Sequence, residues 1–450
     1  MMSIFMFILG SLISMNYISI YFMKLYLLNL ILILYIYELI LNLNINNWNY
    51  WTKVYQEFSM DKVSFILIML TIWMLVLMIL SFINDKVNNL YINLILMMFM
   101  LLSLFIFFSS IDLIKFYLFY EIGLIPIFIL IIGWGKQPER LGAGIYMILY
   151  TVIISLPFFL ILMFVYYNLN SLSIMIFILG DSMIVMGSYI MYIYMIFIFL
   201  VKLPIYFIHV WLPKAHVEAP IYGSMILAGV MLKLGGYGFM RIFFMFKKMI
   251  FSYNMFFMIF IFWGGVIISL MCLRQIDLKM LVAYSSVVHM SMVIVGMMTG
   301  FESGMVGGLI MMVAHGLCSS ALFCLLNLNY KRNNSRLLFF NKGMYLVYSN
   351  LSLMWFIFCV INMAAPPSIN LASEILMILS LYKFSMYFIF FILIFSFFSG
   401  VYSIYLYSFT QHGITFFSWG ISNFMFISEY TLMFLHLYPL ILFIVNLKFF

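Results

Sequence analysis

Charged residues are scarce in this sequence of 450 residues. Only 8% are Asp, Glu, Lys or Arg, whereas 67% are hydrophobic, and the mean hydropathy is +1.21. A soluble domain carries about 25% charged residues, so this chain has too few charges to cover a water-facing surface. The composition therefore excludes an ordinary soluble protein and predicts that lipid or other protein surrounds most side chains.

The chain also lacks the patterns of a metal, redox or nucleic-acid site. Histidines and carboxylates show no metal-ligand spacing, and there is no dinucleotide fingerprint. The net charge of +8 is spread over short loops without a basic block, which argues against nucleic-acid binding. The four cysteines lie in apolar segments without a CxxC pair, which argues against zinc or iron–sulfur ligation and predicts buried positions: Cys272, Cys318, Cys324 and Cys359.

Long apolar runs are the dominant feature of the sequence. A β-barrel would require alternating apolar and polar residues, whereas these runs are continuous over the ~20 residues that cross a bilayer as a helix. The first run has no basic start and no cleavage site, so we expect a retained helix. The expected fold class is all-α, a polytopic membrane protein with about 14 transmembrane helices, near residues 3–22, 25–42, 62–83, 90–110, 112–133, 143–167, 187–211, 221–245, 252–272, 278–298, 303–328, 345–382, 384–409 and 430–448.

Prolines interrupt two of these runs. Pro204 follows Lys202 in the seventh run, and Pro366 and Pro367 precede Glu374 in the twelfth. A proline within a span frees a backbone carbonyl that lipid cannot satisfy, so the opened turn has to face protein or water. Interrupted helices at corresponding places predict inverted repeats, here helices 4–8 and 9–13. The alternative for either proline alone is a kink that only packs helices.

The division of the sequence into these spans predicts four segments. Residues 1–110 hold helices 1–4, and residues 111–250 hold the main part of the first repeat. Residues 251–410 hold the second repeat, and residues 411–450 hold a loop and the last helix.

Ionisable residues inside the expected spans are rare, and six of them form a candidate proton relay: Glu121, Lys202, Lys233, His289, His315 and Glu374. Glu121 lies about nine residues into its span, near the bilayer centre. Lys202 is its natural partner, because a nearby lysine favours the charged carboxylate. The alternatives are a static ion pair that fixes two helices and hydrogen-bonded core histidines. The other histidines are expected near span ends or in loops, with structural roles: His209, His216, His412 and His436.

Two local patterns accompany these residues. Gly235, Gly236 and Gly238 follow Lys233 and predict close helix approach or local hydration, since GGYG lacks the spacing of a phosphate loop. Small hydroxyl residues around both candidate histidines predict bound water. The segment LPKAHVEAP, residues 212–220, is expected to be a loop between helices seven and eight.

Several stretches resemble a known family. KLPIYFIHVWLPKAHVEAPIYGSMILAGVMLKLGGYG, residues 202–238, is similar to the signature of the mitochondrial NADH dehydrogenase subunit 4 family, antiporter-like subunits of respiratory complex I. The resemblance covers the chain from Asp112 onward. Further stretches that carry it are WGKQPERLGAG, LRQIDLKMLVAYSSVVHMS, MMVAHGLCSSALFCLLNLNYKR, PPSINLASEILM and TLMFLHLYP.

The resemblance implies a function and a set of partners. It implies a subunit of H⁺-translocating NADH:ubiquinone reductase in the mitochondrial inner membrane that moves protons but has no redox centre of its own. NADH, FMN, iron–sulfur clusters and ubiquinone would be bound by partner subunits. The partners would be other membrane-arm subunits of complex I, including neighbouring antiporter-like subunits, and the lipid bilayer, but no nucleic acid.

By motif match, each candidate residue corresponds to a family position. Glu121, Lys202 and Lys233 match the glutamate and the two lysines of the first half, and the second half supplies matches to two histidines and a glutamate near the proton exit: His289, His315 and Glu374. Two other functions stay open. One is a cation/proton antiporter outside complex I, and the other is a structural subunit that conducts no ions.

Overall fold

The computed structural model describes residues 2–14, 20–42, 53–55, 58–82, 89–175, 189–246, 250–414 and 425–447. The chain divides into two compact units, and each unit consists of three separate segments of the sequence. Unit 1 comprises Met1–Lys202, Glu218–Ile226 and Lys233–Phe246, and unit 2 comprises Leu203–Val217, Leu227–Leu232 and Lys247–Phe450.

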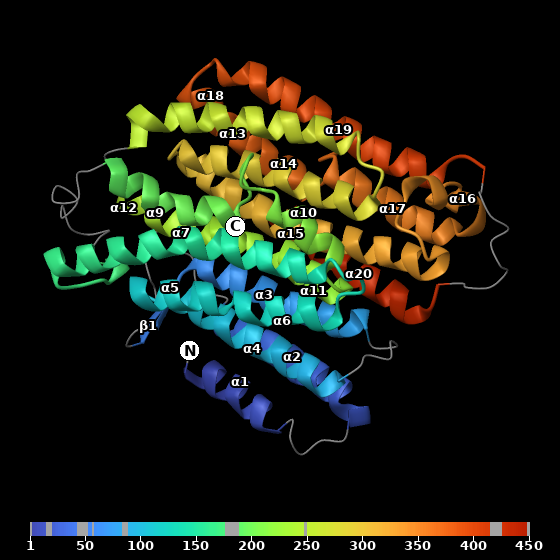
Figure 1. The fold of residues 1–450 in the computed structure, drawn as a ribbon, viewed down its shortest axis with the longest axis horizontal. Coiled ribbons are helices and arrows are strands. Elements are labelled where there is room, and N and C mark those ends of the chain that lie inside the picture. Colours follow the sequence, from blue (N-terminus) through green and yellow to red (C-terminus); the bar gives the residue numbers. More distant parts are fainter. Residues whose placement is uncertain are drawn as a thin grey trace. The chain divides into compact units, whose positions relative to one another are not determined.

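The described residues of unit 1 form helices and one pair of short β-strands (Figure 1). The antiparallel pairing of β1 with β2 falls between the second and third predicted spans, and Phe58 also bridges to Ser110. The elements are α1 (Met2–Ser14), α2 (Ile20–Asn42), β1 (Lys53–Tyr55), β2 (Phe58–Met60), α3 (Lys62–Ser81), α4 (Leu90–Ser109), α5 (Leu113–Ile122), α6 (Leu124–Trp134), α7 (Arg140–Leu169), α9 (Tyr189–Lys202), α11 (Ile221–Ile226) and α12 (Leu232–Met245).

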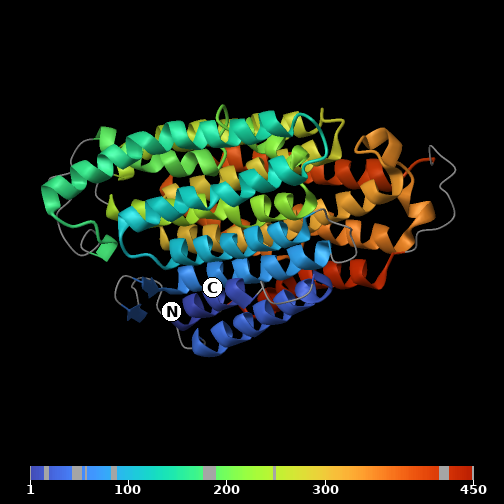
Figure 2. The same ribbon diagram turned by 60° about the horizontal axis from the view of Figure 1, so that its bottom comes forward.

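Burial differs sharply among the helices of unit 1. α3 packs against α2, α4 and α11, and 83% of its apolar window is buried. The long helix α7 runs beside α6 and α9 (Figure 2), yet only 28% of its window is buried. Both helices are apolar on all sides, and an apolar face has to be covered. This chain covers α3, whereas the outer face of α7 requires lipid or a neighbouring subunit.

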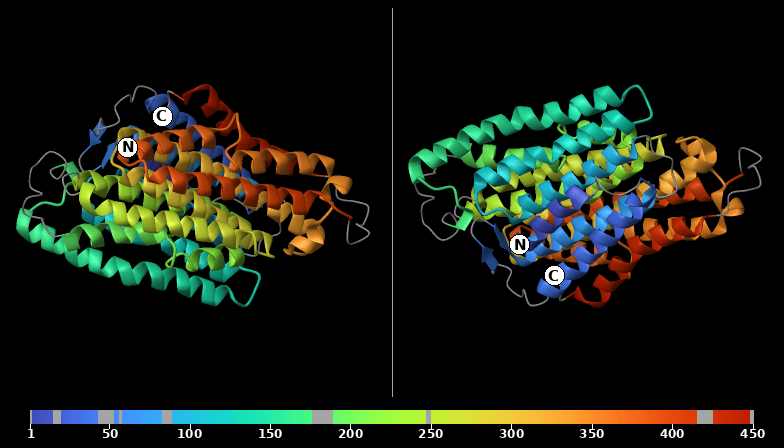
Figure 3. Two further views of the ribbon diagram at one scale, coloured as in Figure 1. Left: turned by 90° about the horizontal axis from the view of Figure 1, so that it is seen from above. Right: turned by 90° about the horizontal axis from the view of Figure 1, so that it is seen from below.

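Unit 2 is built around one long helix, α15 (Glu302–Asn333), whose apolar window is 100% buried. It packs against α14, α17, α18 and α20, and α19 lies along α13 and α17 (Figure 3). The other elements are α10 (Trp211–Glu218), the π-helical turn η3 (Leu227–Met231), α13 (Ile250–Cys272), α14 (Leu278–Met298), η5 (Leu338–Asn341), α16 (Met344–Val347), α17 (Ser349–Asn362), α18 (Ile369–Phe384), α19 (Phe388–Gln411) and α20 (Ile427–Val445).

The predicted class, a polytopic helical membrane protein, is confirmed. Among the described residues, ten helices are long and apolar enough to cross a bilayer, or eleven if the bent pair Leu338–Val347 and Ser349–Asn362 counts as one span. The predicted number of 14 is not confirmed. One reason is the interruption of two helices. As described, α9 has 14 residues and α18 has 16, too few to cross the hydrocarbon alone.

Both predicted interruptions are present. The seventh span stops at Lys202, where α9 ends ahead of Pro204, and residues 203–210 are not helical. The twelfth span stops at Asn362 and resumes at Ile369, on either side of the two prolines. A third interruption, at Gly123 between α5 and α6, was not predicted. The inverted relation of the repeats stays a prediction.

Two local predictions were wrong. Most of LPKAHVEAP is not a loop, because α10 covers residues 211–218. Pro213 occupies the first turn of that helix, where no backbone N–H is needed, so the proline does not prevent it. The break predicted near residue 24 lies inside α2, where the Lys24 ammonium donates a hydrogen bond to the Phe82 carbonyl at the end of α3 (2.8 Å).

The four cysteines are buried, as predicted, and no disulfide bond joins them. They act as small apolar side chains within unit 2.

Candidate functional site

Lys202 is buried at the point where the seventh span breaks. It is the last residue of α9, and its side chain is 1% exposed. Its ammonium donates a hydrogen bond to the Tyr120 carbonyl at 2.8 Å and lies 3.1 Å from the centroid of the Tyr120 ring. The Tyr120 hydroxyl in turn donates to the Ile198 carbonyl at 2.9 Å. The ends of α5 and α9 are therefore joined by one hydrogen bond donated from each helix and by the contact of the ammonium with the ring.

Glu121 lies next to this contact. It precedes the break at Gly123, and Pro126 in the first turn of α6 withdraws an N–H that a continuous helix would use. The carboxylate lies beside the Ser155 hydroxyl of α7 and interacts electrostatically with Lys202. Among the described atoms, its buried Oε1 has no hydrogen-bond partner. The structure thus brings the predicted pair together without a direct ion pair.

Lys233 is fully buried on α12. Only Leu232 separates it from the π-helical turn η3, and such turns occur preferentially at functional positions. The close helix approach predicted here is confirmed at Gly238, where a Cβ would collide with the ring of Phe199 on α9. Unit 1 therefore contains three of the six candidate residues.

Unit 2 brings the two candidate histidines together. His289 on α14 and His315 on α15 are both fully buried, with ring centroids 5.5 Å apart. The Tyr402 hydroxyl of α19 lies 2.9 Å from Nε2 of His289. Asn362, the last residue of α17, lies next to the same imidazole ring. Among the described atoms, Nδ1 of this ring has no hydrogen-bond partner. The break of the twelfth span therefore adjoins the histidine pair.

Glu374 lies on α18, the helix beyond that break. α18 packs against both histidine-bearing helices, α14 and α15. Tyr402 is within electrostatic range of Glu374 as well as bonded to His289. The second-half candidates thus form one neighbourhood, in which Tyr402 interacts with both the histidine and the glutamate.

The hydroxyl groups around the histidines are partly committed to their own helices. Ser286 and Ser291 donate to carbonyls three residues earlier, and Ser319 donates to the His315 carbonyl at 2.7 Å. Such bonds use the hydroxyl proton and leave the oxygen lone pairs as acceptors. Any water bound here would have to donate to these oxygens.

The remaining histidines divide into two groups. His209 and His412 lie outside the helices, as predicted. His216 lies within α10, stacked on the Phe323 ring with centroids 4.7 Å apart. His436 was placed incorrectly, because it is fully buried inside α20, where Nδ1 bonds the carbonyl four residues earlier at 2.8 Å. Their structural roles stay a prediction.

Comparison with known proteins identifies the family. A family model described as "NADH:quinone oxidoreductase/Mrp antiporter, TM" matches residues 110–399. The NADH-ubiquinone oxidoreductase chain 4 of Ceratitis capitata is 45% identical over 88% of this chain and 89% of its own length. That of Locusta migratoria is 41% identical over 91% of both chains. The chain belongs to the NADH-ubiquinone oxidoreductase chain 4 family.

Two solved structures show that the fold extends beyond close relatives of the chain 4 family. A chain of respiratory complex I from Thermus thermophilus has a TM-score of 0.83 at 19% identity, over 98% of this chain and 94% of its own. A chain of the archaeal membrane-bound sulfane sulfur reductase has a TM-score of 0.84 at 17% identity, over 98% and 93%. At such low identity the likeness concerns the fold.

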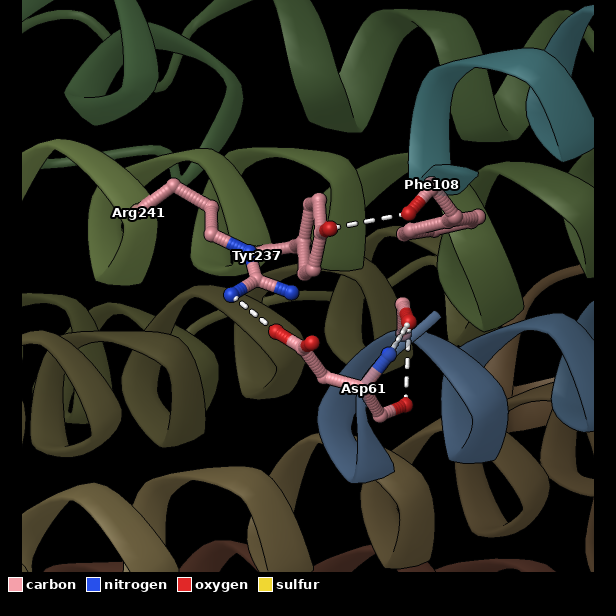
Figure 4. A network of polar contacts seen from close by, with 5 residues as sticks. Asp61, Phe108, Tyr237 and Arg241 are labelled. Carbon is pink, nitrogen blue, oxygen red and sulfur yellow. Dashed lines mark hydrogen bonds and ion pairs between the residues drawn. The ribbon is translucent and has the colours of Figure 1, made fainter. Parts of the chain in front are cut away.

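The structure of this chain 4 family member also contains a buried ion pair that sequence reasoning missed. Nη1 of Arg241 on α12 lies 2.6 Å from Oδ2 of Asp61, which precedes α3 (Figure 4). The guanidinium also lies 4.8 Å from the Tyr237 ring centroid, and the Tyr237 hydroxyl donates to the Phe108 carbonyl at 2.9 Å. Arg241 is 7% exposed and Asp61 1%. The spacing of Lys233, Tyr237 and Arg241, four residues apart on one helix face, was the available signal.

Tyr402 was missed for a different reason. It is one of three tyrosines in α19, and nothing in its local sequence distinguishes it from Tyr405 and Tyr407. Only the packing of α19 against α14 places its hydroxyl at His289.

Proposed function

We propose that this chain is a proton-translocating, antiporter-like membrane subunit of NADH:ubiquinone oxidoreductase, respiratory complex I, in the mitochondrial inner membrane. The observation that carries the proposal is the buried Lys202 at the end of a broken helix, next to Glu121. A charge at such a position is expensive in lipid and is typical of an ion pathway. The names of the chain 4 relatives support the assignment to complex I.

The proposed relay uses six groups, three in each unit. In unit 1 these are Glu121, Lys202 and Lys233, with the glutamate and the first lysine acting as an electrostatically linked pair. In unit 2 they are His289, His315 and Glu374, a neighbourhood that Tyr402 completes. The broken helix ends supply local polarity and carbonyls that side chains can bond, as Lys202 bonds the Tyr120 carbonyl.

The energetics require gating of the relay. Moving one proton against 100 mV costs about 2.3 kcal/mol, so an open wire would conduct protons backwards. The Glu121–Lys202 pair can supply the gate, because a buried ammonium either compensates the carboxylate or leaves it without a countercharge. Redox chemistry in partner subunits supplies the driving force.

The proposal includes the organisation of the chain and of its complex. The segments are residues 1–110, 111–250, 251–410 and 411–450, and the family match from residue 110 to 399 supports the outer two boundaries. NADH, FMN, iron–sulfur clusters and ubiquinone are bound by partner subunits and not by this chain. Its neighbours are other membrane-arm subunits, including antiporter-like ones, which cover apolar faces such as that of α7.

The test is Glu121→Gln in the assembled complex, reconstituted in lipid vesicles. We expect normal amounts of complex and a strong loss of NADH-driven proton pumping, because a neutral amide can neither pair with Lys202 nor carry a proton. Glu302→Gln is the matched control, since Glu302 is an exposed glutamate at the start of α15. It should pump at the parent rate.

Two outcomes would reject the proposal. Undiminished pumping by Glu121→Gln in a fully assembled complex would contradict a role for the pair. Undiminished pumping after neutralisation of all six groups would establish a structural subunit that moves no ions.

A further inference from the structure

The position of the Lys202 ammonium shows an interaction that the family resemblance does not name. Its partners are the carbonyl and the ring of Tyr120, at 2.8 Å and 3.1 Å, and not the carboxylate of the next residue. Tyr120 is fully enclosed, with 1% of its surface exposed. The cation therefore occupies a built site on the last turn of α5.

Two features make this a stable position for a cation. The Tyr120 carbonyl belongs to the last turn of α5, whose terminal carbonyls have no partner within the helix because the chain breaks at Gly123. The ring face carries negative charge density, which attracts an ammonium most strongly where water is excluded. The hydroxyl bond to Ile198, four residues before Lys202, fixes the ring orientation.

Glu121 offers a competing position one residue further along the same helix. It interacts electrostatically with Lys202, while its Oε1 lacks a hydrogen bond to any described atom. A lysine side chain has four rotatable carbon–carbon bonds, so its ammonium can exchange between adjacent residues without helix movement. The location of the ammonium decides whether the carboxylate has a countercharge.

We propose that Tyr120 is a positioning residue for proton transfer, which holds Lys202 in the open state of the Glu121–Lys202 gate. The proposal rests on the proposed function. In the closed state the ammonium contacts Glu121, and in the open state it contacts the ring and carbonyl of Tyr120. The ring sets the population of the open state, because a desolvated cation–π contact changes an equilibrium by a factor of about 30.

The test compares Tyr120→Leu with Tyr120→Phe in the whole complex, reconstituted in vesicles. Leucine keeps the backbone carbonyl but removes the ring, so NADH-driven proton pumping should fall by up to ~30-fold. Phenylalanine keeps the ring and loses only the bond to Ile198, so it should restore most of the pumping. NADH oxidation by a soluble electron acceptor should be unchanged in both variants, because that reaction does not require proton movement through this chain.

Tyr222→Leu is the matched control. Tyr222 is a buried tyrosine of the same unit, packed edge-on against Phe82, with no lysine over its ring among the described contacts. Its loss removes a similar ring and should leave pumping at the parent rate per assembled complex. If Tyr120→Leu prevents assembly, Tyr120→Met takes its place, since the flexible thioether fills similar space without a ring.

The outcomes separate this inference from the proposed function. If Glu121→Gln strongly lowers pumping but Tyr120→Leu pumps like the parent, the role of the ring is overturned. The same conclusion follows if Tyr120→Phe loses as much pumping as Tyr120→Leu. Parent-like pumping by Glu121→Gln would instead reject the proposed function itself.

Discussion

The Asp61–Arg241 ion pair gives the most direct prediction from the structure. We consider Asp61→Asn, which removes the negative charge and keeps the side-chain size. Arg241 would then be a buried cation without its carboxylate, in a position only 7% exposed. Breaking a buried pair from one side costs about 3–5 kcal/mol, because the remaining charge stays desolvated. An asparagine oxygen can still accept a hydrogen bond from the guanidinium, so we expect a loss near 3 kcal/mol, about 150-fold in the folding equilibrium.

The double variant Asp61→Asn with Arg241→Met separates charge from packing. Methionine fills much of the space of the arginine stem without a charge, and replacing both partners of a buried pair is often close to neutral. The double variant should therefore be more stable than Asp61→Asn alone. If both side chains contributed only packing contacts, the double variant would instead be less stable than Asp61→Asn alone.

The assay is the melting temperature of the isolated complex, together with the amount of this chain that assembles. Glu429→Gln is the control, because it breaks the Arg332–Glu429 pair of 2.7 Å, in which the carboxylate side chain is 14% exposed. We expect a smaller loss there, about 1–2 kcal/mol, between the ranges for exposed and buried pairs. A double variant as unstable as Asp61→Asn would refute the reasoning, since the uncompensated charge could not then be the cause.

Two further predictions concern unit 2 and helix packing. Tyr402→Phe should remove the hydrogen bond to His289, destabilise by about 1 kcal/mol and slow proton pumping; parent-like pumping in vesicles would exclude Tyr402 from the relay. Gly304→Ala should destabilise the assembled complex by about 1–3 kcal/mol, because its Cβ would collide with the backbone oxygen of Gly296, which cannot rotate away. Gly142→Ala, with no atom within 4 Å of its Cβ, should melt at or above the parent temperature; equal effects of the two alanines would contradict the packing.

The amino-acid sequence by itself determined the fold class and most helix positions. A continuous apolar run of about 20 residues crosses a bilayer as a helix, because the backbone then satisfies its own hydrogen bonds. The helix α14 accordingly begins and ends where predicted, at residues 278 and 298. The two interruptions followed from prolines, whose missing N–H acts locally. The family was equally accessible, because its motifs are contiguous stretches of sequence.

Two helix distortions could not be predicted from the sequence, because no strong local pattern marks them. The interruption at Gly123 involves a proline three residues later, within a run that otherwise predicts one helix. The π-helical turn ahead of Lys233 has no proline at all. Such distortions depend on what the surrounding helices offer to the freed backbone groups, so tertiary packing decides them.

Only the tertiary structure decided which side chains meet. The sequence predicted that Lys202 and Glu121 pair, but the packing of α5 against α9 placed the ammonium on Tyr120, 82 residues away in the chain. It likewise placed Tyr402 on His289 and Asp61 on Arg241. The physical reason is that helix formation depends on residues within a few turns, whereas a contact of 3 Å depends on how two whole helices pack, which no local pattern specifies.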